Sequence, residues 1–448
     1  MRIDRSKAPE VGTRTLLEPV RPHRSRLDNG MGLVWVRRDR LPGVSLSLVL
    51  PAGADSVGVE SAGIASLVGK LLPEGAAGRS AREMAFWIDG LGAQVGVTVG
   101  YDAMVLRVNT LSDLLEDVLD VLAAVALEPD FLPAEVERCR GERLDAIHRL
   151  RDDPADVAAD VLAELMYGRH PYGRLARGRV ASVERLGRED LVEFHFDRFA
   201  PGVATLVACG DLPEHFPDLV ERRFGSWRGT APAMDPPDAV SVPEMTGIVL
   251  VDRPGGRQSV IRIAGIGLHR GHPEEPSARV MNAILGGLFN SRINLNLRED
   301  KGWTYGARST LSLRRSAGPL TMRAAVETGV TADAVREMLG EALGLREAPP
   351  SEAEMEMAAG ALTRSLPLKF ERNGQIAGSL ADQVVYGLPD DYWATFPGVI
   401  ESVSRSDVHD IAARLLDPAE LTILVVGDKD AVRTKLEELG SVTLTDAP

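Results

Sequence analysis

One pattern occurs twice in this 448-residue sequence and constrains its fold more than any other feature. A proline, a threonine and a Gly-Asp pair have the same spacing at both places, and the second copy follows the first at a constant offset of 217 residues. The copies are Pro201-x3-Thr205-x4-Gly210-Asp211 and Pro418-x3-Thr422-x4-Gly427-Asp428. Each copy predicts a buried strand that ends in a turn, so the repeat indicates an internal duplication.

The elements expected in the two halves follow the same order, which supports two similar domains. The expected strands lie at 33–36, 44–50, 94–99, 103–108 and 203–209, and at 248–251, 259–263, 307–313, 320–326 and 421–426. The expected helices lie at 60–70, 79–90, 112–126, 133–151, 156–167 and 189–199, and at 275–285, 331–343, 351–366 and 406–415. We predict an α+β fold of two homologous domains, each a mainly antiparallel β-sheet covered by helices on one face.

The stretch between the two halves is rich in proline and alanine. It covers Gly229–Val242 and has the composition of a linker. A chain of 448 residues is too long for one ordinary core. We therefore predict an N-terminal domain at 1–228, a linker at 229–246 and a C-terminal domain at 247–448.

The overall composition excludes several classes of protein. The net charge is −14, whereas a nucleic-acid binder normally has a basic face. No apolar run approaches the length that spans a bilayer, and the first 26 residues have no apolar segment of the secretory type. Cys139 and Cys209 are the only cysteines, so neither a disulfide framework nor a thiolate zinc cluster is expected. We expect a cytoplasmic protein that binds neither nucleic acid nor membranes.

One stretch of the second half brings two strong hydrogen-bond donors close together. Arg298 precedes Tyr305 by seven residues, with a glycine turn between them. A guanidinium group offers a planar fork of donors and a phenol offers one more. Two such donors can bind a backbone carbonyl or the oxyanion that forms from it. The glycine pair Gly286-Gly287 and the nearby Asn290 are candidate peptide-binding residues, although the glycines are equally suited to tight helix packing.

Two other groups of polar residues are open to a chemical interpretation. His269, His272 and Glu274 could share a metal ion, but the glycine and proline among them favour an exposed turn. Asp152 and Asp153 could be paired carboxylates, but they precede a proline and are typical of a turn that ends a helix.

The sequence resembles the pitrilysin-type inverzincin peptidases, which include mitochondrial processing peptidase and bacterial two-chain peptidases. The resemblance covers nearly the whole chain, from Leu27-Asp-Asn-Gly30 to Val426-Gly-Asp428. Its most specific part is the pair Arg298 and Tyr305, which matches the family's Arg–Tyr pair in residue type and spacing. By this resemblance, the two side chains bind the substrate and its transition state.

The zinc-binding half of the family's chemistry is missing. Members that are active have His-x-x-Glu-His on the helix after the second strand, and this chain has Ser66, Gly69 and Lys70 at the three positions. The family's third ligand, a glutamate, corresponds to Ala146, and a supporting glutamate corresponds to Cys139. A glycine offers no donor and a lysine ammonium repels a cation, so we expect no zinc in this chain.

The resemblance implies that the chain is the non-catalytic, substrate-binding subunit of a heterodimeric zinc peptidase. It would contribute Arg298 and Tyr305 in trans to a homologous partner that holds the zinc ion and cleaves a peptide. Two alternatives remain. One is a structural or assembly subunit with the same fold, and the other is an independently active peptidase that uses different ligands.

Overall fold

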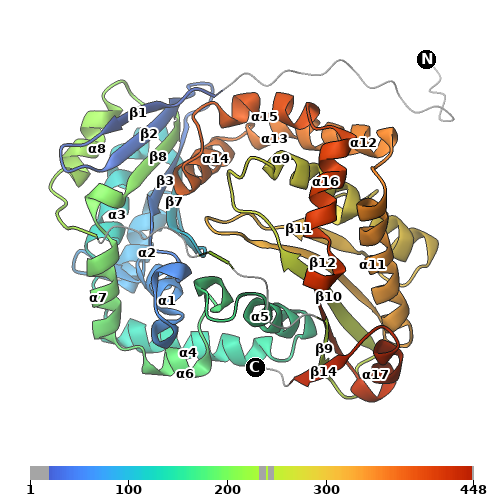
Figure 1. Cartoon of the computed structure of the whole chain (residues 1–448). Helices are drawn as coiled ribbons and strands as arrows, with labels where there is room; N and C mark the ends of the chain where they lie inside the picture. Colours follow the sequence, from blue (N-terminus) through green and yellow to red (C-terminus); the bar gives the residue numbers. More distant parts are fainter. Residues whose placement is uncertain (1–19, 232–238, 241–246, 446–448) are drawn as a thin grey trace, which may run out of the picture.

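The computed structural model describes residues 20–231, 239–240 and 247–445, and these contain two six-stranded sheets (Figure 1). The first sheet has the strand order β1-β2-β8-β3-β7-β6. All its neighbouring strands are antiparallel except β2 and β8, which are parallel. Its strands are β1 (His23–Arg26), β2 (Gly32–Arg37), β3 (Gly43–Leu50), β6 (Gln94–Val99), β7 (Met104–Leu111) and β8 (Thr205–Gly210), while β4 (Gly75–Ala76) and β5 (Arg79–Ser80) form a separate pair.

The second sheet repeats the first. Its order is β11-β12-β10-β13-β9-β14, so β9-β13-β10-β12-β11 corresponds to β2-β8-β3-β7-β6. The two strands of the duplicated sequence pattern, β8 and β13, occupy equivalent positions, each between one parallel and one antiparallel neighbour. The strands are β9 (Gly247–Asp252), β10 (Gln258–Ile266), β11 (Arg308–Leu311), β12 (Pro319–Glu327), β13 (Thr422–Gly427) and β14 (Val442–Thr445).

Helices pack against both sheets. Those of the first half are α1 (Ile64–Leu71), α2 (Ala81–Gly90), α3 (Leu115–Leu127), α4 (Pro133–Leu150), α5 (Pro154–Tyr167), α6 (Val180–Arg185), α7 (Arg188–Arg198) and α8 (Phe216–Phe224). Those of the second half are α9 (Glu275–Asn282), α10 (Arg292–Asn294), α11 (Thr331–Glu347), α12 (Glu352–Arg364), α13 (Leu366–Lys369), α14 (Asn373–Tyr386), α15 (Tyr392–Glu401), α16 (Arg405–Leu415) and α17 (Lys429–Glu437). Short 3-10 turns are η1 (Ala54–Ser56), η2 (Val59–Ser61), η3 (Ser112–Leu114), η4 (Pro171–Gly173), η5 (Pro201–Val203), η8 (Thr328–Val330) and η9 (Pro418–Glu420), and two π-helical segments are η6 (Ala283–Gly287) and η7 (Leu295–Asp300).

Each half also contributes one helix to the other half's sheet. In Figure 1, α14 lies at the top beside β3 of the first sheet, and α5 lies at the bottom beside the second sheet. Val34, Val49 and Val207 share a buried cluster with Ile376 and Leu380 of α14. On the other side of the molecule, α5 residues share a buried cluster with second-sheet valines and leucines, namely Val157, Val161 and Leu162 with Val249, Val251, Val260 and Leu424.

Polar contacts fix the beginning of each of these two helices. The amide of Asn373, the first residue of α14, donates to the backbone oxygen of Gly43 at 2.8 Å. Arg262 of β10 donates to the backbone oxygen of Ala155 in the first turn of α5 at 2.8 Å. Asp153 caps α5 by accepting from the backbone N–H of Ala155 at 2.7 Å. The Asp152–Asp153 stretch is therefore the turn between two helices, as the sequence favours.

The two sheets also meet at the turns of two equivalent hairpins. The buried Asp102, between β6 and β7, accepts a hydrogen bond from the hydroxyl of Tyr172. That hydroxyl accepts in turn from the backbone N–H of Ser316, between β11 and β12, at 3.1 Å. The guanidinium group of Arg314 stacks on Tyr101 at 4.0 Å from the ring centre and on Tyr172 at 4.7 Å.

The predicted fold class is confirmed: two α+β units of equivalent topology, each with a mixed sheet flanked by helices. The predicted linker at 229–246 falls mostly outside the described residues, so the boundaries of the domains stay a prediction. The helix expected at 60–70 is shorter, because Gly63 at its start has a positive φ of 101° and α1 begins at Ile64.

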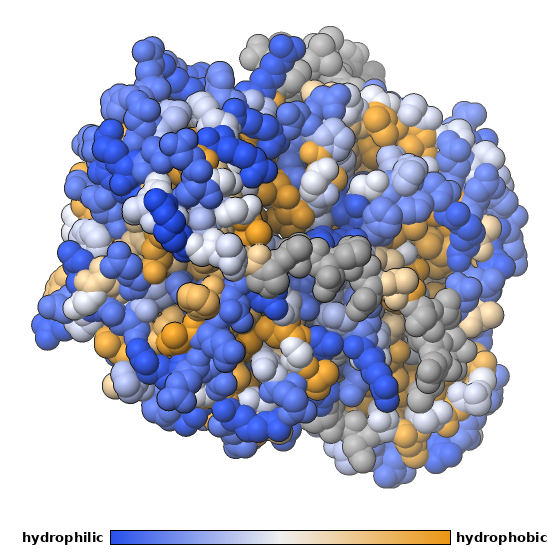
Figure 2. Space-filling view, turned by 60° about the vertical axis from the view of Figure 1, so that its left-hand side comes forward, coloured by the Kyte–Doolittle hydropathy of each residue, from blue (hydrophilic) through white to orange (hydrophobic). Residues whose placement is uncertain are grey.

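The hydropathy of the surface and of the helices is relevant to whether the chain could cross a membrane. Figure 2 shows one face that is mostly hydrophilic, with hydrophobic residues in separate patches. None of the helices in the described part of the chain has the length and apolar character needed to cross a membrane.

The contact between the hairpins yields a test of stability. Tyr172→Phe removes the hydroxyl that joins Asp102 to Ser316, and Tyr172 is only 2% exposed. We expect the free energy of unfolding to fall by about 1–3 kcal/mol, because the buried Asp102 side chain loses one of its two donors. Tyr305→Phe is a matched control, since Tyr305 is 95% exposed and should change stability by less than about 0.5 kcal/mol. Chemical denaturation measures both; equal stability of the two variants would contradict the role given to Tyr172.

Candidate functional site

By the resemblance, the family's zinc-binding positions fall on α1. This helix is held by the buried side chains of Ile64, Leu67, Val68 and Leu71. Ser66 lies on this helix, and its hydroxyl donates to the backbone oxygen of Gly63 at 2.9 Å. This hydroxyl is therefore already engaged in a hydrogen bond within the first turn of its own helix.

Gly69 lies where α1 packs on the edge strand β6. A Cβ atom at this position would lie 2.7 Å from a methyl carbon of Val99 and 3.1 Å from one of Val97. Both distances are shorter than ordinary van der Waals contact, so even an alanine requires the strand to shift. A glutamate, which the family's motif has here, would need still more room.

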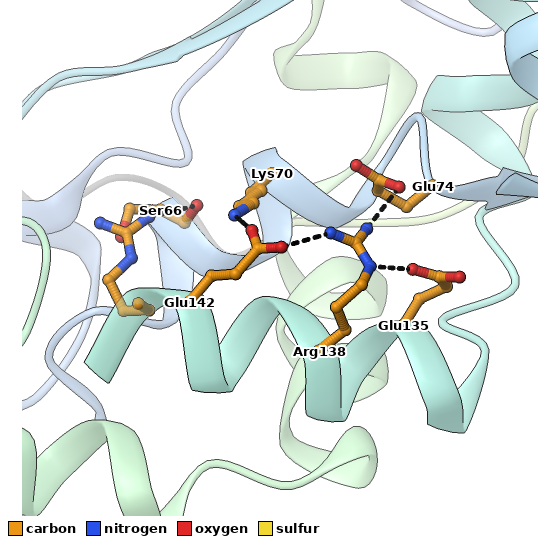
Figure 3. Close-up of polar contacts among 7 residues, drawn as sticks. Ser66, Lys70, Glu74, Glu135, Arg138 and Glu142 are labelled. Atoms are coloured by element: carbon orange, nitrogen blue, oxygen red, sulfur yellow. Dashed lines mark hydrogen bonds and ion pairs between the residues drawn. The ribbon is translucent and has the colours of Figure 1, made fainter. Parts of the chain in front are cut away.

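Lys70 belongs to a network of ion pairs between α1 and α4 (Figure 3). Its ammonium group pairs with the carboxylate of Glu142. Arg138 binds the same carboxylate at 2.8 Å, and also binds Glu74 and Glu135 at 2.6 Å each. Hydrogen bonds from Lys70 and then Arg138 lower the pKa of Glu142 below its usual value. Two cations and three carboxylates thus occupy the region beside α1.

On the face of α4 that is turned toward α1, the carboxylate of Glu142 is already paired with Lys70 and Arg138. Cys139 is fully buried, and burial raises the pKa of its thiol. Ala146 has no donor atom. Arg143 lies between them on the helix, and its guanidinium group donates to the backbone oxygen of Ser66 at 3.4 Å. Burial, and then the charge of Arg177, lower the pKa of Arg143.

The residues present at these positions do not fit a zinc ion. Zinc sites use thiolate, imidazole and carboxylate donors, whereas Ser66 offers a bound hydroxyl, Gly69 no side chain and Lys70 an ammonium group. The carboxylates nearby are neutralised by Lys70 and Arg138. Within residues 20–231, 239–240 and 247–445, no three His, Cys, Asp or Glu side chains are grouped as they would be around a metal ion.

The other half of the predicted site lies on the π-helical segment η7 and the loop after it. Arg298 is partly exposed; its guanidinium group stacks on the ring of Phe289 at 4.6 Å and its Nε lies 3.3 Å from a carboxylate oxygen of Glu299. Tyr305 is 95% exposed. Its hydroxyl makes no hydrogen bond with any residue that the structure describes. Both donors are therefore accessible to a ligand.

The glycine pair before this segment has a structural explanation. A Cβ atom on the buried Gly286 would lie 2.3 Å from the backbone nitrogen of Ser309 in β11. A Cβ atom on Gly287 would lie 2.9 Å from atoms of Asn282. Of the two interpretations left open by the sequence, tight packing accounts for both glycines. Asn290 is exposed in the loop that follows, so it can still contact a ligand.

Asn294 organises this segment and was not singled out in the sequence. Its buried amide donates to the backbone oxygen of Phe289 at 2.7 Å and accepts from the backbone N–H of Ala307 at 3.0 Å. One side chain thereby joins the two ends of the loop that carries Arg298 and Tyr305. A polar residue among apolar neighbours, in Ile293-Asn294-Leu295, was the available signal.

Two further contacts attach the segment to the helices beneath it. Arg292 binds Glu354 of α12 through two hydrogen bonds of 2.6 and 3.1 Å. Although burial acts in the opposite direction, the hydrogen bonds from Arg292 and Ser351 lower the pKa of Glu354 to about 2. Asn296 donates to Glu337 and Glu341 of α11 at 2.9 and 2.7 Å. The donors Arg298 and Tyr305 are therefore presented by a supported loop.

The histidine cluster forms the turn that its glycine and proline favour. The rings of His269 and His272 are 5.0 Å apart and meet edge to face. His272 lies 3.9 Å from Glu274, and burial lowers the pKa of its imidazole.

Comparison with known protein families and sequences places this geometry among the peptidases. The family described as Insulinase (Peptidase family M16) matches residues 34–178, and that described as Peptidase M16 inactive domain matches residues 185–362. An uncharacterised zinc protease of Mycobacterium tuberculosis is 27% identical over 402 residues, covering 88% of this chain and 91% of that protein. The beta subunit of mitochondrial-processing peptidase from Mus musculus is 22% identical over 238 residues, covering 52% of this chain and 48% of that protein.

Two solved structures have the same fold. A peptidase M16 inactive domain from Pseudomonas fluorescens matches with a TM-score of 0.85 and 23% identity, covering 91% of this chain and 98% of that one. A protease from Helicobacter pylori matches with a TM-score of 0.86 and 16% identity, covering 92% of this chain and all of that one. The chain therefore belongs to peptidase family M16, as a member whose sequence contains no His-x-x-Glu-His motif.

Proposed function

We propose that this chain is the substrate-binding subunit of a two-chain zinc peptidase. Its partner would be a homologous chain with an intact zinc motif, and its substrate an extended peptide. The observation that carries the proposal is the contrast between two regions. The region beside α1 is filled by the ion pairs of Lys70 and Arg138, whereas Arg298 and Tyr305 are accessible on a supported loop.

Arg298 and Tyr305 would act on the scissile peptide bond in the partner's site. A guanidinium group and a phenol can each donate to the carbonyl oxygen, and more strongly to the negative oxygen of the tetrahedral intermediate. The stack on Phe289 restricts the guanidinium plane of Arg298, and Asn294 fixes the loop on both sides. Such support lowers the cost of orienting the donors when the substrate binds.

The first sheet offers a second place for an extended peptide. β6 is an edge strand, paired with β7 on one side only, and its residues are exposed or half-buried throughout. A peptide could add itself to this edge through backbone hydrogen bonds. Because β6 also contacts α1, a peptide bound there would lie close to the region that corresponds to the zinc site in related chains.

The second candidate function is a structural or assembly subunit without a peptidase role. The absence of a zinc motif agrees with both functions. A structural subunit has no chemical need for an accessible phenol and guanidinium seven residues apart. This pair therefore favours the peptidase role.

Substitution of the two donors in the complex distinguishes the candidates. Arg298→Ala and Tyr305→Phe should each lower the turnover number for peptide cleavage about a hundred- to a thousandfold, which is the range for loss of an oxyanion donor. Arg336→Ala is the control, because it removes an exposed arginine of the same half that pairs with Asp333. Wild-type turnover in both donor variants would refute their role, and a complex that cleaves no peptide would favour the structural function.

The close contacts at Gly69 allow a test of whether α1 has room for a side chain at this position. Gly69→Ala should lower the free energy of unfolding by about 1 kcal/mol or more, because the new methyl group meets Val99. Gly141→Ala in α4 should instead raise it by about 0.5–1 kcal/mol, since a Cβ there meets no atom within 4 Å and alanine favours the helix. Thermal or chemical denaturation measures both. A stabilising effect of Gly69→Ala as large as that of Gly141→Ala would show that room for a side chain exists.

A further inference from the structure

A cavity lies between the two halves, apart from the segment that carries Arg298 and Tyr305. Its volume is about 310 Å³, which is sufficient for a small molecule or one long side chain. The β6–β7 hairpin, the connection between β11 and β12, and α14 form its walls. The lining residues are Thr98, Gly100, Tyr101, Asp102, Ala103, Val105, Ser312, Leu313, Arg314, Asp382, Val385 and Tyr386.

Two of the three charged side chains in the cavity wall are engaged by other groups. Asp102 accepts from the hydroxyl of Tyr172 with one oxygen and from the backbone N–H of Arg315 with the other, at 3.3 Å. The guanidinium group of Arg314 is stacked on Tyr101 and Tyr172, although its buried Nη1 has no hydrogen-bond partner among the described residues. These contacts hold the two halves together, so both groups serve the fold.

Asp382 is the exception. It is half-buried on α14, and its carboxyl group makes no hydrogen bond or ion pair with any residue that the structure describes. Burial raises the pKa of this carboxyl group. A carboxyl group removed from water without a partner is costly, and the cost disappears when a cation binds it.

The neighbouring cations have other contacts. Lys369 and Arg270 act on Asp382 from a distance, and so do Arg107 and Arg279. The ammonium group of Lys369 lies 3.9 Å from the ring centre of Trp393. Arg270 and Arg279 both pair with Glu275, and Arg107 donates to Thr98 at 2.8 Å. These charges lower the pKa of Asp382 without supplying the hydrogen bonds that it lacks.

The rest of the cavity suits a hydrocarbon chain. Ala103, Val105, Leu313 and Val385 offer apolar surface, and the ring of Tyr386 adds an aromatic wall. The carboxyl groups of Asp102 and Asp382 both raise the pKa of Tyr386, which shows that they act on the same part of the cavity. Arg270 and Arg314 lower that pKa, but less than burial and the two carboxyl groups raise it.

We propose that this cavity binds an alkylammonium group, with Asp382 as its counter-ion and the apolar wall against its carbon chain. The ligand is either a small free amine or the lysine side chain of a peptide, which have the same chemistry. The proposal does not depend on the role of Arg298 and Tyr305, because neither residue lines this cavity. It can be tested on the isolated chain.

Calorimetric titration of the chain with n-butylamine, and with n-butanol and butyrate as probes of the same length, tests the proposal. Only the amine should bind. Asp382→Asn should weaken its binding about ten- to a hundredfold, which corresponds to the loss of a hydrogen bond to a charged group. Asp391→Asn is the matched control, because it removes an exposed carboxylate from the neighbouring helix start and should leave the affinity unchanged.

The dependence on pH is a second readout. Because only the ionised carboxylate pairs with the amine, affinity should fall as the pH is lowered through the raised pKa of Asp382, and binding near that pKa should release protons. Asp382→Asn should abolish this proton release. If this variant does not fold, Val385→Phe fills the cavity while keeping Asp382, and should also prevent binding.

The source of the amine is identified with two further probes. Cadaverine represents a free amine, and a short peptide with a central lysine represents a side chain; the tighter of the two shows which ligand the cavity accommodates. Absence of amine binding at millimolar concentration, equal affinity in Asp382→Asn, or preferential binding of butyrate would each overturn the proposal.

Discussion

The packing of one helix from each half on the other half's sheet is the constraint on which the rest of the structure depends. α14 covers Val34, Val49 and Val207, and α5 covers Val249, Val251 and Leu424. Complete burial of such side chains stabilises a fold by about 1.5–3 kcal/mol each, although estimates from the folded structure are upper limits. Neither sheet can bury its second face without the other half. The two halves therefore form one rigid support for the loop of Arg298 and Tyr305.

Apolar packing contributes more than the ion pairs to holding α1 in place. The ion pairs of Lys70 and Arg138 with Glu142, Glu74 and Glu135 involve side chains that are 23–48% exposed. Exposed pairs of this kind contribute about 0–1 kcal/mol each. The buried Leu67, Val68 and Leu71 contribute more, because each loses nearly all its contact with water. The ion pairs place positive charge beside α1, while apolar packing keeps this helix in position.

Much of this arrangement could be predicted from local sequence patterns. The duplicated Gly-Asp turn identified two equivalent strands, β8 and β13, and the order of apolar segments gave the fold class. The spacing of Arg298 and Tyr305, together with the segments 27–30 and 426–428, led to the family, and Ser66, Gly69 and Lys70 were the departure from it. These features are local, because each depends on residues within one or two elements.

Contacts between distant segments could not be predicted in the same way. Helix α14 was not among the expected helices, and its apolar positions do not indicate that it packs on the first sheet. The partners of Lys70 and Asn294 lie on other elements or across a loop, and charged or amide side chains show no periodic pattern that identifies a partner. Asp382 resembles any other acidic residue in a helix until the cavity around it is known.

In the proposed function, this chain holds half of a peptidase site. Zinc content and peptide cleavage, measured for the chain alone, for a homologous chain with the intact motif and for the two mixed, test this most directly. We predict that the isolated chain holds no stoichiometric zinc and cleaves no peptide, and that the mixture forms a complex that cleaves. Stoichiometric zinc and cleavage in the isolated chain would contradict the account.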